Sequence, residues 1–154
     1  MIIKIISIGS QPSKEINHLI ESYSHKVYAY SKIEWINLQL KSKDKNIKIK
    51  KELESQNILS KIDSNAFVIS LDEKGQTFSS VEMSQQLEKI MLNHSNINFI
   101  IGGADGLDQA VLDKSNLVMS LSNLTLPHQL VKVFLIEQIY RSYSIINNLP
   151  YHRE

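Results

Sequence analysis

The chain has 154 residues, 42% of them hydrophobic, with five histidines, no cysteine and a formal net charge of +1. This length predicts one domain, spanning residues 1–154, that can bury a core without metal or disulfide support. The lack of cysteine excludes disulfides, thiolate metal sites and cysteine nucleophiles, and it is typical of a reducing cytoplasm. The near-neutral charge gives no overall argument for a nucleic-acid partner.

Short β-rich segments alternate with helical patterns along the chain. The first segment is apolar but too short to cross a membrane, and it lacks the features of a signal peptide, so we expect a strand and no membrane association. Alternation of this kind predicts an α/β fold with a mostly parallel sheet and flanking helices, whose ligands bind beyond the carboxyl ends of the strands. The predicted strands are Ile2–Ile8, Ile33–Leu40, Ala66–Leu71, Ile97–Ile101 and Leu117–Leu121.

Between the first four predicted strands, apolar residues recur at helical spacing. Ser79 and Glu82 form a capping-box pattern at the start of one helix, in which each side chain satisfies a backbone N–H. The apolar residues expected to face the core are Ile16, Leu19, Ile20, Tyr23 and Val27 in the first helix, Leu53, Ile58, Leu59 and Ile62, less regularly, in the second, and Met83, Leu87, Ile90 and Met91 in the third.

A lysine-rich stretch, Lys41–Lys51, carries six lysines in eleven residues against the single acid Asp44. Charge runs of this kind are usually solvated surface. The alternative is a patch that binds a phosphate backbone and makes binding sensitive to salt. The sequence leaves the role of this stretch open.

Three glycines lie within the five residues that follow the fourth strand, at Gly102, Gly103 and Gly106. Glycine allows a ligand to approach the backbone closely, although a tight strand-to-helix turn would need glycine too. The spacing is not the dinucleotide fingerprint, and no P-loop lysine follows, so the pattern disfavours a nucleotide-binding dehydrogenase and a nucleotide triphosphatase.

The stretch Ser120–His128 leaves the fifth strand and enters the last helix, with Pro127 near the first helical position. By itself it is typical of helix capping. The helix, from about Pro127 to Asn147, is apolar on two sides and therefore needs two partners, one of which is its own sheet. A neighbouring helix or a second subunit would be the other, and we expect a symmetric homodimer.

Conventional catalytic groups are scarce. No histidine pair has metal-ligand spacing beside a carboxylate, and we expect no metal. Asp72 and Glu73 follow a strand end, where such residues usually begin a turn. Methyl transfer from a sulfonium suits this scarcity, because it needs alignment rather than an enzyme nucleophile. The polar tail that ends in Tyr151, His152 and Arg153 is either frayed or a contact for RNA.

Taken in order, these pieces resemble the RlmH family of SPOUT ribosomal-RNA methyltransferases over the whole length of the chain. The segments that carry the resemblance are Ile8-Gly9, Leu71-Asp72 with Gly75, Ile101-Gly102-Gly103 with Gly106-Leu107, Ser120-Leu121-Ser122, Thr125-Leu126-Pro127-His128, Glu137-Gln138-Ile139-Tyr140-Arg141 and Pro150-Tyr151-His152-Arg153-Glu154. The lysine-rich stretch is not part of the pattern.

The resemblance implies a SPOUT-type fold with a C-terminal trefoil knot, S-adenosyl-L-methionine (SAM) as cofactor, and a homodimer in which two subunits build each active site. It also implies methylation of N3 of a pseudouridine in a stem-loop of 23S ribosomal RNA, on the assembled ribosome in the cytoplasm. The cofactor residues would be Leu71, Gly102, Gly103, Ser122, Asn123, Leu124, Thr125, Leu126 and Pro127.

The tail of the partner subunit would position the base. His152 and Arg153 are the expected catalytic residues, and Arg141, Tyr151, His152 and Arg153 are the expected RNA contacts, with a structural salt bridge as the other role for Arg141. The general base for N3, the exact nucleotide and the need for assembled subunits stay open. A non-catalytic RNA- or ribosome-binding module that uses Lys41–Lys51 is the alternative.

Overall fold

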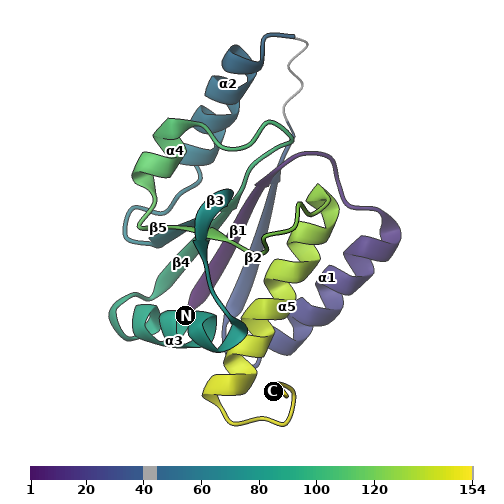
Figure 1. The fold of residues 1–154 in the computed structure, drawn as a ribbon, viewed down its shortest axis with the longest axis vertical. Helices are drawn as coiled ribbons and strands as arrows, with labels where there is room; N and C mark the ends of the chain where they lie inside the picture. The colour runs from purple at the N-terminus through teal and green to yellow at the C-terminus, as the bar shows by residue number, and fades with distance from the viewer. Residues whose placement is uncertain (40–44, 154) are drawn as a thin grey trace.

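A computed structural model describes residues 1–39 and 45–153 of the chain. Five parallel strands form one sheet, as predicted, and their order is β2-β1-β4-β3-β5 (Figure 1). The elements are β1 (Ile2–Ile8), α1 (Lys14–Val27), β2 (Lys32–Leu38), α2 (Ile47–Leu59), β3 (Phe67–Thr77), α3 (Ser80–Asn93), β4 (Asn96–Ile101), α4 (Gln109–Lys114), β5 (Leu117–Ser120) and α5 (His128–Ile146).

Helices cover both faces of the sheet, with α1, α3 and α5 on one face and α2 and α4 on the other (Figure 1). Alternate residues of β4 therefore enter separate clusters: Phe99 packs with the first set of helices and Ile100 with the second. Both are fully buried. Burial on both sides explains why these strands are almost continuously apolar in sequence.

Strand β3 runs beyond the predicted end at Leu71. It continues to Thr77, with a shift in its register against β5 between Leu71 and Gln76. The predicted turn exists within this irregularity, where the Lys74 N–H donates to Asp72 Oδ1 over 2.9 Å. A Cβ on Gly75 would lie only 2.6 Å from the backbone carbon of Met119, so glycine lets the strand resume against β5.

Helix α4 was not predicted as a separate element. It has six residues, of which only Val111 is fully buried, so its apolar pattern is too short to show helical periodicity. The capping box that opens α3 is confirmed. The Glu82 N–H donates to Ser79 Oγ over 3.2 Å, and the Ser79 N–H donates to Glu82 Oε2 over 2.7 Å.

Helix α5 finds two neighbours within its own chain, because it packs against both α1 and α3. Leu135, Ile136 and Ile139 are fully buried among these helices and the sheet. Leu130 and Phe134 stay partly open to solvent, at 37% and 43% exposure. Contacts within the chain therefore account for the two-sided apolar pattern along most of α5, but they leave these two side chains partly uncovered.

Candidate functional site

The predicted cofactor segments meet at one edge of the sheet. Leu71 of β3 lies opposite Ile101 of β4, directly before Gly102, and also opposite Met119 of β5. Thr77 then pairs with Ser120, shortly before the loop 122–127. The parallel strands therefore bring three segments that are far apart in sequence to the same carboxyl edge, where ligands of α/β sheets bind.

The loop 122–127 is ordered by two serines and presents an apolar side chain outward. Ser120 Oγ donates to the Ser122 carbonyl and the Leu124 N–H donates to Ser122 Oγ, both over 2.9 Å. Leu124 is 75% exposed, and Asn123, Thr125 and Pro127 are exposed beside it. The loop holds its shape while leaving an apolar residue uncovered.

The two adjacent glycines are needed first for packing within the chain. A Cβ on Gly102 would lie 2.9 Å from the Leu107 side chain, and one on Gly103 would lie 3.2 Å from both Ile8 and Glu54 Oε1. Gly103 therefore sits beneath α2. The turn closes with a hydrogen bond of 3.1 Å from the Gly106 N–H to the Gly103 carbonyl, and Gly106 has a φ of +79°, a conformation that favours glycine.

Glu54, which sequence reasoning missed, is a buried carboxylate against this turn. It is only 5% exposed, and burial raises its pKa, while the charge of Lys50 opposes that shift. Lys50 also reaches Asp105 of the turn, with 3.4 Å between Nζ and Oδ2. One lysine of the lysine-rich stretch therefore helps to hold α2 on the glycine turn, and Lys41 and Lys43 lie outside the described residues.

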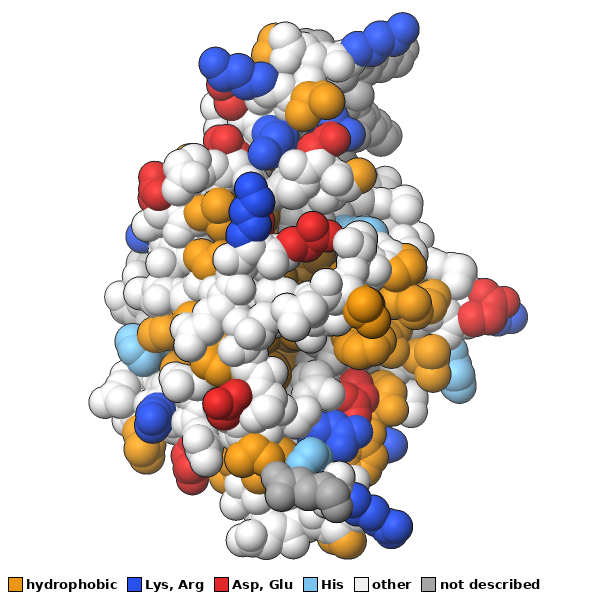
Figure 2. Space-filling view, in the orientation of Figure 1, with side chains coloured by type: hydrophobic (Ala, Val, Ile, Leu, Met, Phe, Trp, Pro, Cys, Tyr) orange, Lys and Arg blue, Asp and Glu red, His pale blue; other side chains and the backbone are white. Residues whose placement is uncertain are grey.

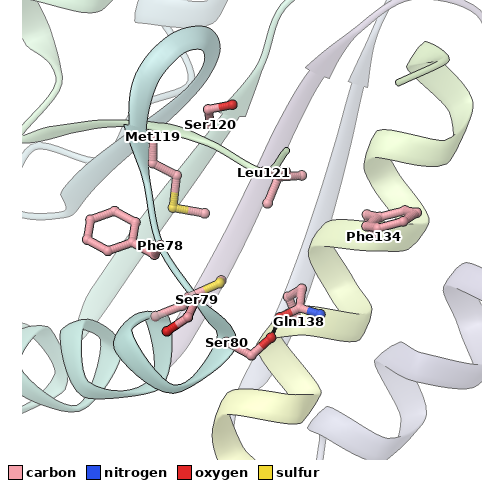
Figure 3. A pocket seen from close by; sticks show the side chains of 9 residues that line it. Phe78, Ser79, Ser80, Met119, Ser120, Leu121, Phe134 and Gln138 are labelled. Atoms are coloured by element: carbon pink, nitrogen blue, oxygen red, sulfur yellow. Dashed lines mark hydrogen bonds between the residues drawn. The ribbon is translucent and has the colours of Figure 1, made fainter. Parts of the chain in front are cut away.

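A pocket of about 120 Å³ opens beside the loop 122–127, between the start of α3, the end of β5 and the middle of α5 (Figure 3). Ser80 Oγ donates to Gln138 Oε1 across it over 2.7 Å. No motif in the sequence pointed to this pocket, because its walls come from three distant segments. Its lining residues are Phe78, Ser79, Ser80, Met83, Met119, Ser120, Leu121, Phe134 and Gln138.

The C-terminal tail is folded back on α5 rather than frayed. Asn148, with a φ of +54°, turns the chain, and the Leu149 N–H donates to the Ser144 carbonyl over 2.8 Å. Tyr151 is half-buried, its hydroxyl donating to Glu137 Oε1 over 3.0 Å. The interpretation of this tail as a disordered terminus is wrong.

Arg141 holds both the helix and the tail. Its Nη2 lies 2.6 Å from Glu137 Oε1 and its Nη1 donates to His152 Nδ1 over 3.2 Å, while its guanidinium stacks 4.8 Å from the centre of the Tyr151 ring. The hydrogen bond with Glu137 raises the pKa of Arg141, and burial is the main cause that raises the pKa of Tyr151. Arg141 thus makes the structural salt bridge that was the alternative to an RNA contact, and the RNA contact stays a prediction. Arg153 is exposed beyond this cluster.

The tail and the loop 122–127 lie at opposite ends of α5. Arg141 follows His128 by thirteen residues, which at the rise of an α-helix is about 20 Å. A single chain therefore does not bring His152 and Arg153 to the loop that contains Leu124.

A second buried polar cluster lies near the start of α5. Lys132 is fully buried, and its Nζ donates to Asn37 Oδ1 over 3.0 Å; Ser7 Oγ donates to the same oxygen over 2.5 Å. Burial lowers the pKa of Lys132, and burial followed by the charge of Lys132 lowers the pKa of His128. The His128 ring packs against Gly9, whose added Cβ would lie 2.9 Å from Nε2.

Within residues 1–39 and 45–153, no three histidine, aspartate or glutamate side chains are grouped closely enough to hold a metal ion. No helix of the same described residues is long and apolar enough to cross a membrane.

Comparison with known protein families places the chain in one of them. A family model described as "Predicted SPOUT methyltransferase" matches residues 1–152. The chain belongs to the SPOUT methyltransferase family.

Named relatives are similar over almost the whole chain. Proteins named ribosomal RNA large subunit methyltransferase H from Acholeplasma laidlawii, Clostridium botulinum and Streptococcus suis are each 42% identical, covering 99% of this chain and 100% of theirs. A solved structure titled as a probable methylase family protein from Haemophilus influenzae has the same fold, with a TM-score of 0.54 at 16% identity over 99% of this chain and 70% of that one.

Proposed function

We propose that the chain is a SAM-dependent methyltransferase that modifies N3 of a pseudouridine in a stem-loop of 23S ribosomal RNA. It would act in the cytoplasm on the assembled ribosome. The observation that carries the proposal is the 42% identity, over full length, to relatives whose names state methylation of large-subunit ribosomal RNA. The meeting of three loops at one sheet edge supports it independently.

The residues at this edge fit SAM. The cofactor, when bound, supplies an electrophilic methyl group. Leu71 and the uncovered Leu124 offer apolar surface to an adenine ring, and the backbone of 122–127 offers hydrogen-bonding groups along an exposed loop. Gly102 and Gly103 would both contribute through their backbone, because the place of a Cβ is taken by Leu107 at Gly102 and by Glu54 and Ile8 at Gly103.

The N3 atom of the target must lose its proton before it can attack a methyl group. Tyr151, His152 and Arg153 are the groups of this chain proposed to position the base or stabilise the anion. The Arg141 guanidinium, which can only donate, makes Nδ1 of neutral His152 an acceptor and leaves the ring proton on Nε2. Exposed Arg153 is free to meet a phosphate or the charged base.

A homodimer would reunite the two parts of this site. The separation of tail and loop along α5, about 20 Å, supports a site completed by the tail of a second copy. Figure 2 shows hydrophobic side chains gathered over α5 and α1, and Leu130, Phe134 and Leu19 are among the exposed large hydrophobic residues.

We also propose the trefoil knot of the family for the C-terminal half. The match of residues 1–152 to the SPOUT methyltransferase family supports it, and the strand order, in which the connection through α4 crosses β3 to reach the edge, is compatible with it. Stretching the chain from both termini would test it. A knotted chain would stay shorter than its full contour length, and an unknotted chain would reach it.

Calorimetry with SAM and mass spectrometry of ribosomal RNA test the enzyme proposal. We expect SAM to bind, and ribosomes from cells without the protein to gain one methyl group on incubation with it. Arg153→Ala should leave SAM affinity within about twofold and lower turnover by about tenfold or more, as for the loss of a charged hydrogen bond. Lys14→Ala, an exposed change on α1, is the control. Loss of SAM binding in Arg153→Ala would contradict the role given to the tail.

The alternative, an RNA-binding module without catalysis, draws on the exposed lysines over α2, visible at the top of Figure 2. Lys45 and Lys48 are exposed there. Salt-sensitive RNA binding without any SAM binding would favour the module over the enzyme.

A further inference from the structure

We propose that Lys26 of α1 is a positioning residue for methyl transfer, because its ammonium holds the carboxyl-terminal tail in place through three tyrosine rings. The inference rests on the proposed function, in which His152 and Arg153 of this tail meet the target base. It gives a role to a residue that no motif in the sequence singled out.

The ammonium of Lys26 faces three aromatic rings. Its Nζ lies 5.0 Å from the centre of the Tyr23 ring, 5.4 Å from that of Tyr140 and 5.9 Å from that of Tyr151. A cation over a ring face, within about 6 Å of its centre, is attracted by the negative charge of that face. Lys26 therefore occupies an aromatic cage made of Tyr23 from α1, Tyr140 from α5 and Tyr151 from the tail.

The rings of the cage also pack against one another. The Tyr140 and Tyr151 rings meet edge to face with 4.7 Å between their centres, and the Tyr23 and Tyr140 rings are tilted at 6.5 Å. Such pairs add attraction beyond the burial of their area. The pKa of Tyr151 is raised first by burial and then by a hydrogen bond with Tyr23. Tyr151 is therefore joined to α1 and α5 together.

Lys26 connects the tail to a second element. Beyond Leu149 the tail depends on side chains, since the Tyr151 N–H donates to the Leu149 carbonyl within the tail itself. Glu137 and Arg141, which contact the tail, belong to α5, the helix that the tail directly follows. Because Lys26 belongs to α1, it fixes the tail relative to the body of the molecule, toward which the tail turns back (Figure 1).

The ring of Tyr151 is occupied by contacts within its own chain. The Lys26 ammonium lies 5.9 Å from its centre, the Arg141 guanidinium 4.8 Å and the Tyr140 ring 4.7 Å. A base that stacked on this ring, as bases do on tyrosines of RNA-binding proteins, would have to displace at least one of these groups. Tyr151 therefore acts by holding the tail, which leaves contact with the target base to the two residues that follow it.

Amide hydrogen exchange of the tail, measured without RNA, is the first test. In Lys26→Met the Leu149 and Tyr151 amides should exchange about threefold to thirtyfold faster, because losing such an attraction makes local opening more frequent. Lys26→Arg keeps a cation over the rings and should stay within about twofold of the wild type. Lys26 is exposed, so both variants should fold, and Lys14→Met, an exposed change at the other end of α1, is the matched control.

Steady-state methylation of ribosomes is the second test. Lys26→Met should lower kcat about threefold to tenfold, because a tail that opens more often spends less time in the productive position. Lys26→Arg should restore most of this loss, and Lys14→Met should show none. The SAM dissociation constant should stay within about twofold in all three variants, since the cofactor loop 122–127 lies at the other end of α5.

A double-mutant cycle with Tyr151→Ala shows whether Lys26 acts through the tail. In a protein that already carries Tyr151→Ala, Lys26→Met should lower kcat no further, because the two residues act as one unit. A loss that adds in full to that of Tyr151→Ala would mean that Lys26 meets RNA directly, which overturns the inference. Tail exchange that is unchanged in Lys26→Met, or as fast in Lys26→Arg as in Lys26→Met, would overturn it too.

The two readouts separate this inference from the proposed function. A wild-type protein that neither binds SAM nor methylates ribosomes would defeat the proposed function, and tail exchange would still report on the cage. In an active enzyme, faster tail exchange in Lys26→Met with an unchanged kcat would show that the cage is structural only, and Lys26 would lose its positioning role.

Discussion

At the residue scale, several polar side chains of this protein are buried where the sequence suggests only a surface or an apolar face. Lys132 lies on α5 between apolar neighbours and is fully buried, with Asn37 as its hydrogen-bond partner. Glu54 is buried against Gly103. Burial disfavours the charged form of each, so their ionisation is coupled to folding.

Lys132 should make stability depend on pH in the alkaline range. Burial lowers its pKa below the usual 10.5, so the unfolded chain binds more protons than the folded one between the lowered value and 10.5. The contribution of Lys132 to the free energy of unfolding therefore rises with pH across that window. Lys132→Met should remove this rise, as measured by urea unfolding at several pH values. Lys14→Met, an exposed control, should retain it. A slope unchanged in Lys132→Met would show that folding does not lower the pKa of Lys132.

Gly103 and Glu54 allow packing to be separated from cofactor binding. Gly103→Ala would press on Glu54 and Ile8 at 3.2 Å, and we expect a loss of roughly 1 kcal/mol in unfolding free energy. The double variant Glu54→Ala/Gly103→Ala should lose less than the sum of the two single changes, because the clash is relieved. Recovery of SAM binding in the double variant would assign Gly103 to packing. A persistent binding defect would assign it to the cofactor.

At the element scale, the ends of strands and helices define the site more than their middles. The irregularity of β3 between Leu71 and Gln76 lets this strand place Leu71 at the predicted cofactor edge and lead directly into Phe78, which lines the pocket. The start of α3 supplies Ser80, held in place by the capping box of the preceding residue.

Ser79→Ala should destabilise the protein by about 1 kcal/mol, because it removes the side-chain acceptor of the α3 capping box. The Glu82 side chain should then be less ordered. Hydrogen bonds with Ser79 lower the pKa of Glu82, so in the variant this pKa should move back toward its usual value. Chemical denaturation and NMR titration measure the two effects. Ser13→Ala, which removes the N-cap of α1, is the matched control. An unchanged Glu82 pKa would mean that the backbone bond alone orders this carboxylate.

At the scale of the whole molecule, one chain holds the predicted cofactor loop 122–127 and the tail apart. Helix α5 is covered by α1 and α3 along much of its length, so the apolar surface that remains for a partner is small and centred on Leu130 and Phe134. Dimerisation through this surface is the arrangement proposed to complete the site.

We expect the wild-type protein to sediment as a dimer at micromolar concentration and Leu130→Glu to sediment as a monomer, because a carboxylate at this surface would have to be desolvated in the interface. The monomer should methylate ribosomes poorly if each site needs two subunits. Leu92→Glu, which changes a leucine that is 80% exposed on α3, is the control and should stay dimeric. A wild-type monomer with full activity would contradict the shared site.

The sequence by itself determined the five strands, their parallel direction with helices between them, and the sheet edge at which the predicted cofactor segments meet. These features depend on local periodicity and on rules of parallel sheets, both of which are written in short stretches of chain. The apolar run of β1 and the Ser79–Glu82 pair are examples in which structure follows directly from neighbouring residues.

Only the tertiary structure decided the pocket, the contact between Glu54 and Gly103 and the folding of the tail onto Arg141. Ser80 and Gln138 are 58 residues apart, and no local pattern signals that two such side chains will meet. The extension of β3 likewise depends on how closely Gly75 approaches β5. Contacts of this kind arise from the packing of whole elements, which fixes distances that periodicity does not contain.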